Sequence, residues 1–450
     1  MTGDPAPRLP FTVIDQAVHL FDSPAEPWGV QLELALRATL DEDRLRAAIR
    51  QALARHPLAR ARQLPARLTD REWCWEVAPE PEVEPLRVVD CADDDALAAT
   101  RATLYSRQVP LVEAPPLRLV LARGPQGASL LLNANHAAFD GVGCLRLLQS
   151  VARAYTGEPD PDPPVSLAQA RDVQGLLAAA DGRARARRFR LLASKLADIA
   201  VRPARLATDG GSDEPGYGFH HVVLSKDQTA ALLSGDGGPT VNDVLLVALT
   251  VAVVGWNEEH GRRAGRVGIL MPVNLRPKAW REDVVTNLVL DARVVTMASQ
   301  RTEPAALLRA ISEQTDRVKA GAGPALIEVI GGWTSLPLWA KQLLSPLLWF
   351  TGNRLVDTAL MSNLGTATDE LDFGPGVGVP EHAWFSAPTR MPCGLSVGVL
   401  TVGGRLHVTF RYRRPLLGAA AAAQLARCFV AELERAATIS NGDSPSPRGR

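Results

Sequence analysis

The sequence predicts an α/β protein of two lobes, and three observations carry this prediction. The chain has 450 residues, which is more than one hydrophobic core usually covers. Strand-like runs rich in β-branched residues alternate with segments whose apolar positions recur at helical spacing. Four prolines between Glu158 and Pro164 mark a boundary. We expect lobes at residues 1–175 and 219–438, a basic linker segment at 176–218 and a disordered tail at 439–450.

The first lobe is predicted to open with a strand and a helix. Val30 to Leu36 is apolar and compatible with a strand, and Asp41 then caps a helix. This helix ends near His56-Pro57, because a proline disfavours helical geometry in the residue before it. The remaining predicted elements are a strand at 73–77, a helix at 96–105, and a hairpin-like pair at 117–122 and 129–135.

The second lobe is predicted around a buried helix. The longest apolar run, Val244 to Trp256, falls short of the roughly 20 residues that span a bilayer. We therefore expect no transmembrane segment but a core helix, with Thr240 and Asp243 close to a capping box. Strands are expected at 219–224, 267–273, 288–295, 358–362, 394–402 and 406–412, and further helices at 304–319 and 416–437.

The overall chemistry of the chain excludes several classes of protein. Lysine and arginine number 49, as do aspartate and glutamate, so nothing global favours nucleic acid or an anionic membrane. The five cysteines are scattered, without a Cys-x-x-Cys pair, which favours a reduced cytoplasm over a disulfide framework or a zinc site. The N-terminus has no apolar core and does not resemble a signal peptide.

The stretch 135–141 (Asn-His-Ala-Ala-Phe-Asp-Gly) is the strongest candidate for a functional site. It follows the strand-like run that begins at residue 129 and precedes a helix-like run at 142–155. A neutral histidine, with a pKa of about 6.5 when unperturbed, suits a general base at neutral pH. A packed structural histidine is the alternative for His136 alone. The whole His-x-x-x-Asp-Gly string is more specific, since chance produces it in roughly a few per cent of chains this long.

Several further motifs occur in a recognisable order over residues 10–437. They are Leu32 to Leu58 with its Arg-His-Pro ending, Thr240 to Leu246, Met271 to Arg276, Met361 to Gly365 and Asp372 to Gly374. With the His136 stretch, they make the chain resemble the chloramphenicol acetyltransferase-like superfamily of acyltransferases. Its members include nonribosomal peptide condensation domains, wax ester synthases and polyketide-associated acyltransferases, with the motif His-His-x-x-x-Asp-Gly. Two departures stand out: Asn135 replaces the first histidine, and Pro375 follows Asp372-Phe373-Gly374 where some branches have tryptophan.

The resemblance implies two chloramphenicol acetyltransferase-like lobes that form a pseudo-dimer with a tunnel at their interface. It implies that His136 is the catalytic base, and that Asp140 and Gly141 are structural. Arg276 is the candidate partner of Asp140. Residues that could line the substrate site are Asn135, Ser362 and Ser396.

The resemblance also implies the reactants. The co-substrate would be a thioester of coenzyme A or of a carrier protein's phosphopantetheine, with no tightly bound cofactor and no metal. The acceptor would be an alcohol or an amine, in natural-product biosynthesis. We expect a cytoplasmic monomer that binds no nucleic acid. The competing interpretation is a non-catalytic condensation-like module that recruits a carrier protein or partner enzyme; Asn135 favours it, whereas His136 and Asp140 favour the enzyme.

Two other motifs are weaker. Gly394 to Gly398 matches the Gly-x-Ser-x-Gly elbow of hydrolases, but that elbow needs a strand, a turn and a helix, and here strand-like residues continue. No acid lies between Ser396 and His407 either. A metal site at His220-His221 is disfavoured, because adjacent side chains in a strand face opposite sides.

Two further segments allow both a functional and a purely structural interpretation. The basic segment Gly182 to Arg205 could dock an acidic carrier protein or coenzyme phosphates, although a solvated linker helix is favoured. The segment 331–352, with Trp333, Trp339 and Trp349, could shape an apolar acceptor channel or rest on a membrane. Core packing of proline-broken helices is the favoured interpretation.

Overall fold

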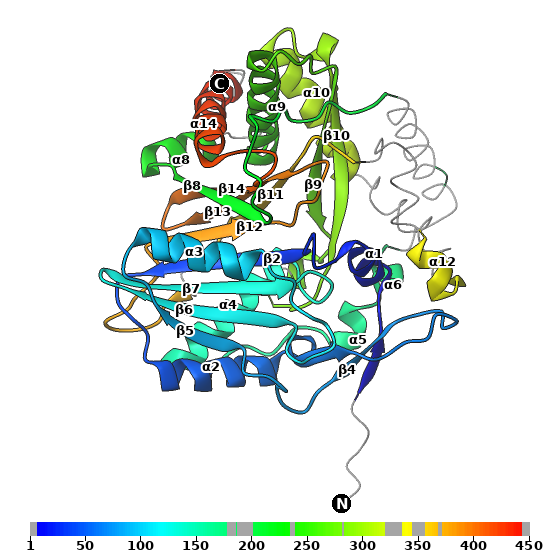
Figure 1. Cartoon of the computed structure of the whole chain (residues 1–450), viewed down its shortest axis with the longest axis vertical. Coiled ribbons are helices and arrows are strands. Elements are labelled where there is room, and N and C mark those ends of the chain that lie inside the picture. The colour runs from blue at the N-terminus through cyan, green and yellow to red at the C-terminus, as the bar shows by residue number, and fades with distance from the viewer. Residues whose placement is uncertain are drawn as a thin grey trace, which may run out of the picture.

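Two mixed sheets organise the chain, one in each half (Figure 1). The computed structural model describes residues 7–177, 186, 201–234, 239–280, 283–319, 335–343, 356–367 and 371–442. Most of the basic segment, together with Trp333, Trp349 and the end of the predicted tail, lies outside these residues. A small three-stranded sheet, in the order β1-β4-β3, flanks the first half.

The first lobe contains a five-stranded sheet in the order β12-β2-β7-β6-β5. Strand β7 is apolar on both faces. Leu130 and Leu132 join the core under α2 and α4, whereas Leu131 packs with Tyr105 of α3 on the other face. The elements are β1 (Arg8–Pro10), α1 (Val13–Phe21), β2 (Gly29–Leu36), α2 (Glu42–Arg55), β3 (Ala61–Gln63), β4 (Cys74–Val77), β5 (Leu86–Asp90), α3 (Asp94–Tyr105), β6 (Leu117–Gly124), β7 (Gly127–Asn135), α4 (Gly141–Thr156), α5 (Leu167–Ala170) and α6 (Val173–Leu177).

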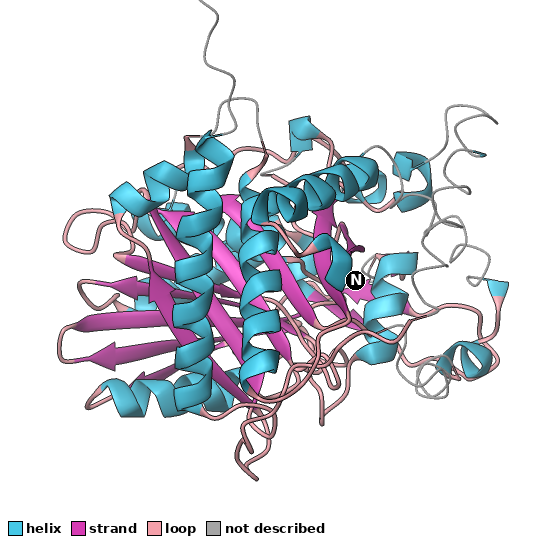
Figure 2. Cartoon of the chain, turned by 90° about the horizontal axis from the view of Figure 1, so that it is seen from above, coloured by secondary structure: helices cyan, strands magenta, loops and turns pink. Residues whose placement is uncertain are grey.

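The second lobe contains a six-stranded sheet in the order β10-β9-β11-β13-β14-β8. Figure 2, seen from the top of Figure 1, shows helices covering the strands of this lobe. The elements that this half of the chain forms are β8 (Tyr217–Val223), α8 (Lys226–Leu233), α9 (Val241–Glu259), β9 (Arg266–Asn274), β10 (Val289–Met297), α10 (Pro304–Arg317), α12 (Leu338–Gln342), β11 (Ala359–Thr366), β12 (His382–Ser386), β13 (Leu395–Val402), β14 (Arg405–Arg413) and α14 (Ala419–Gly442). Two of them, α12 and β12, lie against the first lobe.

Helix α9 is the core helix expected from the apolar run. Among the described helices it alone is long and apolar enough to cross a membrane, but most of it is buried inside the protein. Asp243 accepts a hydrogen bond from the backbone N–H of Thr240 at 2.7 Å, which is one half of the expected capping box. Its other carboxylate oxygen accepts from the hydroxyl of Thr315 on α10 at 2.6 Å, so the same residue ties two helices together.

Strand β12 corrects the predicted division of the chain. It belongs by sequence to the second half, yet it pairs antiparallel with β2 of the first sheet, with Phe385 opposite Leu32. It packs at the same time against β13 and β14. A Cβ atom on Gly398 of β13 would lie 2.1 Å from the carbonyl oxygen of Phe385, so only glycine permits this approach.

Two smaller expectations also need correction. Helix α14 continues to Gly442, so the predicted tail begins inside a helix. Trp339 of α12 is 53% exposed and does not pack in the core. The reason is that α12 is anchored through its neighbour, buried Leu338, whose backbone N–H donates to the carbonyl of Asp70.

Candidate active site

The turn that carries His136 is held by both lobes. It connects the end of β7 at Asn135 with the start of α4 at Gly141. The backbone N–H of His136 donates to the carbonyl of Trp28 at 3.0 Å, next to β2. The side-chain amide of Asn287, just before β10, donates to the His136 carbonyl at 2.7 Å. The position of the histidine is therefore fixed where the lobes meet.

The imidazole of His136 has one defined hydrogen bond. Its Nδ1 lies 2.7 Å from the carbonyl oxygen of Phe139. A carbonyl oxygen only accepts, so Nδ1 carries the proton and Nε2 is the basic nitrogen. The side chain is half-buried and lines a cavity. This arrangement allows Nε2 to take a proton from a bound molecule.

Asp140 and Arg276 form the ion pair behind this turn. Arg276 donates Nη1 to Oδ2 of Asp140 at 2.6 Å and Nη2 to Oδ1 at 3.0 Å, and both side chains are buried. Oδ1 also accepts from the N–H of Gly143, which caps α4, and Oδ2 from the N–H of Leu288, both at 2.8 Å. Asp140 therefore has its acceptor sites filled by structural partners and does not face the cavity as a free base.

The cavity beside His136 has a volume of about 270 Å³ and is lined from both lobes. It opens where two strands of the second sheet separate. Strands β9 and β11 pair only at Ala359 with Ile269 and at Leu360 with Leu270. The continuing segments Met271–Asn274 and Ser362–Leu364 then line the cavity on either side of the gap. The first lobe contributes Trp28, Val30, His136, Gly141 and Val142.

Gly141 lies where the lobes approach each other closely. A Cβ atom there would lie 2.5 Å from Cδ2 of Leu364 and 2.9 Å from Cε2 of Phe385. Ser362 lines the cavity as expected. The structure corrects the expectation for the other two candidates, because neither Asn135 nor Ser396 lines it.

Both of these residues are used inside the protein. The side-chain amide of Asn135 donates to Asp22 at 2.8 Å and to the carbonyl of Val109 at 2.9 Å. Ser396 is fully buried in β13 and donates to the carbonyl of Ala387 at 2.8 Å. Since Ser396 lies within a continuous strand, the structure also excludes a hydrolase elbow at this position.

Asn274 is a site residue that the sequence did not single out. Its Oδ1 accepts from the backbone N–H of Arg276 at 3.0 Å and from Nη1 of Arg276 at 3.3 Å. Its Nδ2 is buried and has no hydrogen-bond partner among the described residues, and the residue lines the cavity. A donor of this kind can stabilise an oxyanion that forms next to it. Asn274 is part of the Val-Asn-x-Arg sequence at residues 273–276. That its Nδ2 is free becomes clear only in the structure, where Arg276 donates to Oδ1 of Asn274.

Asp291 is a second residue that the sequence reasoning missed. It lies on β10, lines the cavity and is accessible from it. The side chain is exposed to solvent, yet the protein atoms around the carboxyl limit its hydration and raise its pKa above the ordinary value, while positive charge on His136 acts in the opposite direction.

The adjacent histidines of β8 are structural, as expected. The ring of His221 lies tilted against Trp384 of β12, with the ring centroids 4.3 Å apart, and burial lowers its pKa well below the ordinary value. His220 is half-buried, and burial lowers its pKa as well. In the described part of the chain, no group of three or more His, Cys, Asp or Glu side chains is placed to hold a metal ion.

Sequence comparisons identify relatives along the whole chain. It is 34% identical over 430 residues to the uncharacterized proteins MT2362 and Rv2305 of two Mycobacterium tuberculosis strains, covering 94% of this chain and 98% of either protein. It is 24% identical over 488 residues to a linear gramicidin synthase polypeptide of Brevibacillus parabrevis, a match that covers all of this chain but only 6% of that much longer synthase polypeptide. No model of a known protein family matches the sequence.

Solved structures share the fold at lower identity. The first condensation domain of the calcium-dependent antibiotic synthetase, in complex with a substrate analogue, superposes with a TM-score of 0.71 at 17% identity, over 96% of this chain and 97% of that one. The starter condensation domain of rhizomide synthetase, in complex with C8-CoA and Leu-SNAC, gives 0.67 at 16% identity, over 96% and 95%. The chain therefore belongs to the family of the two mycobacterial proteins, and its fold is that of the chloramphenicol acetyltransferase-like condensation domains.

Proposed function

We propose that this chain is an acyltransferase that moves an acyl group from a thioester to an alcohol or amine acceptor. The observation that carries the proposal is the geometry of His136. Its Nδ1 is committed to the Phe139 carbonyl, which leaves Nε2 as the base in a cavity lined by both lobes. The condensation-domain fold supports transfer of acyl or peptidyl groups in natural-product synthesis.

The proposed reaction needs one general base and one hydrogen-bond donor from the protein. Nε2 of His136 removes the proton from the acceptor O–H or N–H while the acceptor attacks the thioester carbonyl. The carbonyl oxygen gains negative charge, and Nδ2 of Asn274 donates to it. When the tetrahedral intermediate collapses, the C–S bond breaks and the imidazolium returns the proton to the thiolate. A positioned base contributes roughly 10²–10⁴ in rate, and one oxyanion donor contributes about 10²–10³.

The proposed reactants follow from this chemistry. The donor is a thioester on coenzyme A or on a carrier protein's phosphopantetheine; the rhizomide synthetase domain was crystallised with ligands of this kind. The acceptor is an alcohol or amine, and neither a tightly bound cofactor nor a metal enters the scheme. We place the enzyme in the cytoplasm as a monomer. The five free cysteines, three of them buried, support a reducing location.

The decisive experiment measures acceptor-dependent release of thiol. The full chain is incubated with a panel of acyl thioesters, on coenzyme A and on a carrier protein, and products are identified by mass spectrometry. We expect His136→Ala to lose at least about 100-fold in turnover without a large change in melting temperature. His220→Ala on β8, which does not line the cavity, is the matched control. Equal turnover in the His136→Ala protein would remove the proposed base.

The same assay tests the alternative of a recruiting module and that of a hydrolase. Asn135 is weak evidence for a loss of catalysis. Its side-chain amide makes hydrogen bonds inside the protein, and His136 keeps its position beside the cavity. Tight binding of a carrier protein with no turnover across the panel would favour the module. Thiol release that needs no acceptor would favour a hydrolase.

A further inference from the structure

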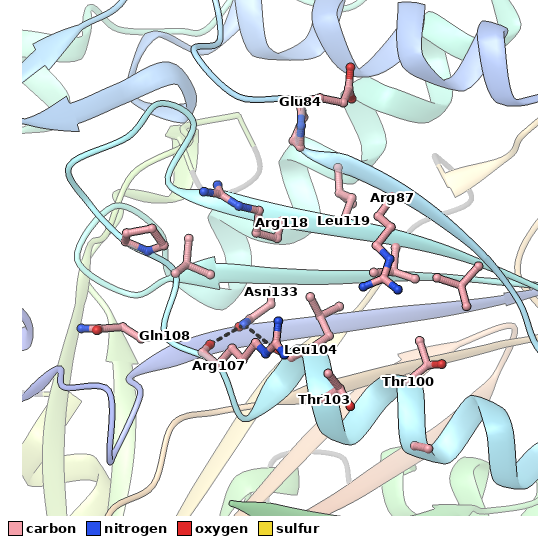
Figure 3. A pocket seen from close by; sticks show the side chains of 16 residues that line it. Glu84, Arg87, Thr100, Thr103, Leu104, Arg107, Gln108, Arg118, Leu119 and Asn133 are labelled. Atoms are coloured by element: carbon pink, nitrogen blue, oxygen red, sulfur yellow. Dashed lines mark hydrogen bonds between the residues drawn. The ribbon is translucent and has the colours of Figure 1, made fainter.

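A second cavity lies in the first lobe, between α3 and the strands β5 and β6 (Figure 3). Its volume is about 440 Å³, which falls within the usual range of roughly 300–1,000 Å³ for small-molecule sites. None of its lining residues lines the cavity beside His136. Nothing in the proposed acyl transfer uses it.

The walls of this cavity are mainly apolar. They are formed by Val89, Leu104, Val109, Leu119 and Val120. Only Tyr105 of α3 is buried, so this helix does not seal the sheet beneath it. A slot remains that is suited to an aliphatic chain, because burial of apolar surface is favourable.

Three arginines from separate elements line the same slot: Arg87 of β5, Arg107 after α3 and Arg118 of β6 (Figure 3). Arg87 and Arg107 are exposed, and neither has an ion pair or a side-chain hydrogen bond with a described residue. Arg118 pairs with Glu113 at 3.0 Å. The one carboxylate that lines the slot, Glu84, is already paired with Arg46 at 2.9 Å. The slot therefore carries excess positive charge.

The backbone that presents Arg107 is held in place. Asn133 of β7 donates from Nδ2 to the carbonyls of Leu104 and Arg107, at 2.9 and 3.1 Å (Figure 3). Arg118 is likewise held by the carbonyls of Pro115 and Leu117, both at 2.8 Å. The backbone of Arg107 and the guanidinium of Arg118 therefore need little further ordering when a ligand binds.

We propose that this cavity binds a single-chain anionic amphiphile. The carboxylate or phosphate head pairs with the guanidinium groups of Arg87 and Arg107, which match such oxyanions through paired N–H donors. Arg118, whose Nη1 and Nη2 already donate within the protein, adds positive charge beside the head. The aliphatic chain lies against the apolar walls between α3 and the sheet. The site stands independently of the proposed acyl transfer, since binding requires neither His136 nor a thioester.

Calorimetric titration of the full chain tests the proposal with three ten-carbon probes below their aggregation limits: decanoate, decyl phosphate and decanol. We expect at least one anion to bind, and decanol to bind at least about tenfold more weakly. Binding of only one anion identifies the head group. Equal binding of decanol, or binding of neither anion, overturns the proposal.

Variants locate the site. The double variant Arg87→Glu/Arg107→Glu should weaken anion binding by about tenfold or more. The matched control is Arg50→Glu, another exposed arginine, on the opposite helix α2, without a partner among the described residues. Ala99→Trp on α3 fills the slot from an exposed position and should abolish binding while all three arginines remain. Undiminished affinity in either the double variant or Ala99→Trp would place the ligand elsewhere.

Discussion

Asp140 and Arg276 form a buried two-point ion pair, at 2.6 and 3.0 Å, that joins the turn of His136 to the second lobe. Arg276 also donates to the carbonyls of Val284 and Thr286, at 3.0 and 2.8 Å. The first lobe supplies the histidine, and the second lobe supplies the cation that holds its turn. The orientation of the base therefore depends on correct docking of both halves.

Loss of this pair should destabilise the whole protein. Asp140→Ala leaves the buried guanidinium of Arg276 without its counter-charge, which costs about 3–5 kcal/mol in free energy of unfolding. Urea denaturation measures this cost. Glu381→Ala is the control, because its pair with Arg37 is exposed and 3.8 Å long, and such pairs contribute about 0–1 kcal/mol. Similar losses in the two variants would contradict the structural role of Asp140.

Asn274 should affect turnover rather than binding. Asn274→Asp retains the oxygen that accepts from Arg276 but removes the unpartnered Nδ2 donor. We expect kcat to fall by about 10²–10³, with a much smaller change in KM, measured with any thioester and acceptor pair that the parent turns over. Ser362→Ala, on the opposite side of the β9–β11 gap, should change kcat much less. A rise in KM at constant kcat would show that Asn274 only binds substrate.

Gly398 should tolerate no side chain. Gly398→Ala places a methyl group 2.1 Å from the Phe385 carbonyl oxygen, and overpacking of this kind costs about 1–3 kcal/mol or more. Gly255→Ala in α9 is the control with the opposite sign, because nothing lies within 4 Å of the added methyl group. Within a helix that change stabilises by roughly 0.5–1 kcal/mol. Thermal melts of the two variants should therefore shift in opposite directions.

Stability should decline as the pH falls below 6.5. His407 is buried beside His382, with 3.2 Å between their ring nitrogens. Burial, reinforced by His382, lowers the pKa of His407 to about 4. Between pH 6.5, the ordinary pKa of histidine in the unfolded chain, and pH 4, His407 is protonated in the unfolded chain but not in the folded one. The contribution of neutral His407 to folding stability is therefore complete above pH 6.5 and is lost as the pH falls towards 4.

Urea denaturation at pH 7, 6 and 5 measures this dependence. Buried His56, whose pKa is lowered to about 3, contributes with the same sign. His407→Gln should therefore reduce the decline between pH 6.5 and 5 without abolishing it. An unchanged decline in that variant would show that His407 is already protonated in the folded protein or takes no part.

Local features of the sequence predicted much of the fold and part of the site. The His136 turn followed from its motif and the buried helix α9 from its apolar run, whereas the contact of Arg276 with Asp140 was expected only from the family resemblance. Strand β12 was missed, since its partner β2 lies about 350 residues earlier and five residues carry little periodic signal. The free amide of Asn274 and the three arginines of the second cavity depend on which atoms meet in space, and no local pattern encodes that.

The position of β12 has a consequence for how the polypeptide matures. Until residues 382–386 have been synthesised, the outer edge of β2 has no neighbour, and an unpaired edge invites association with other chains. A shortened product ending before β8 would expose that edge permanently, so expression of the first half alone should give aggregates. Completion of the first sheet must wait until the ribosome has translated the codons for residues 382–386.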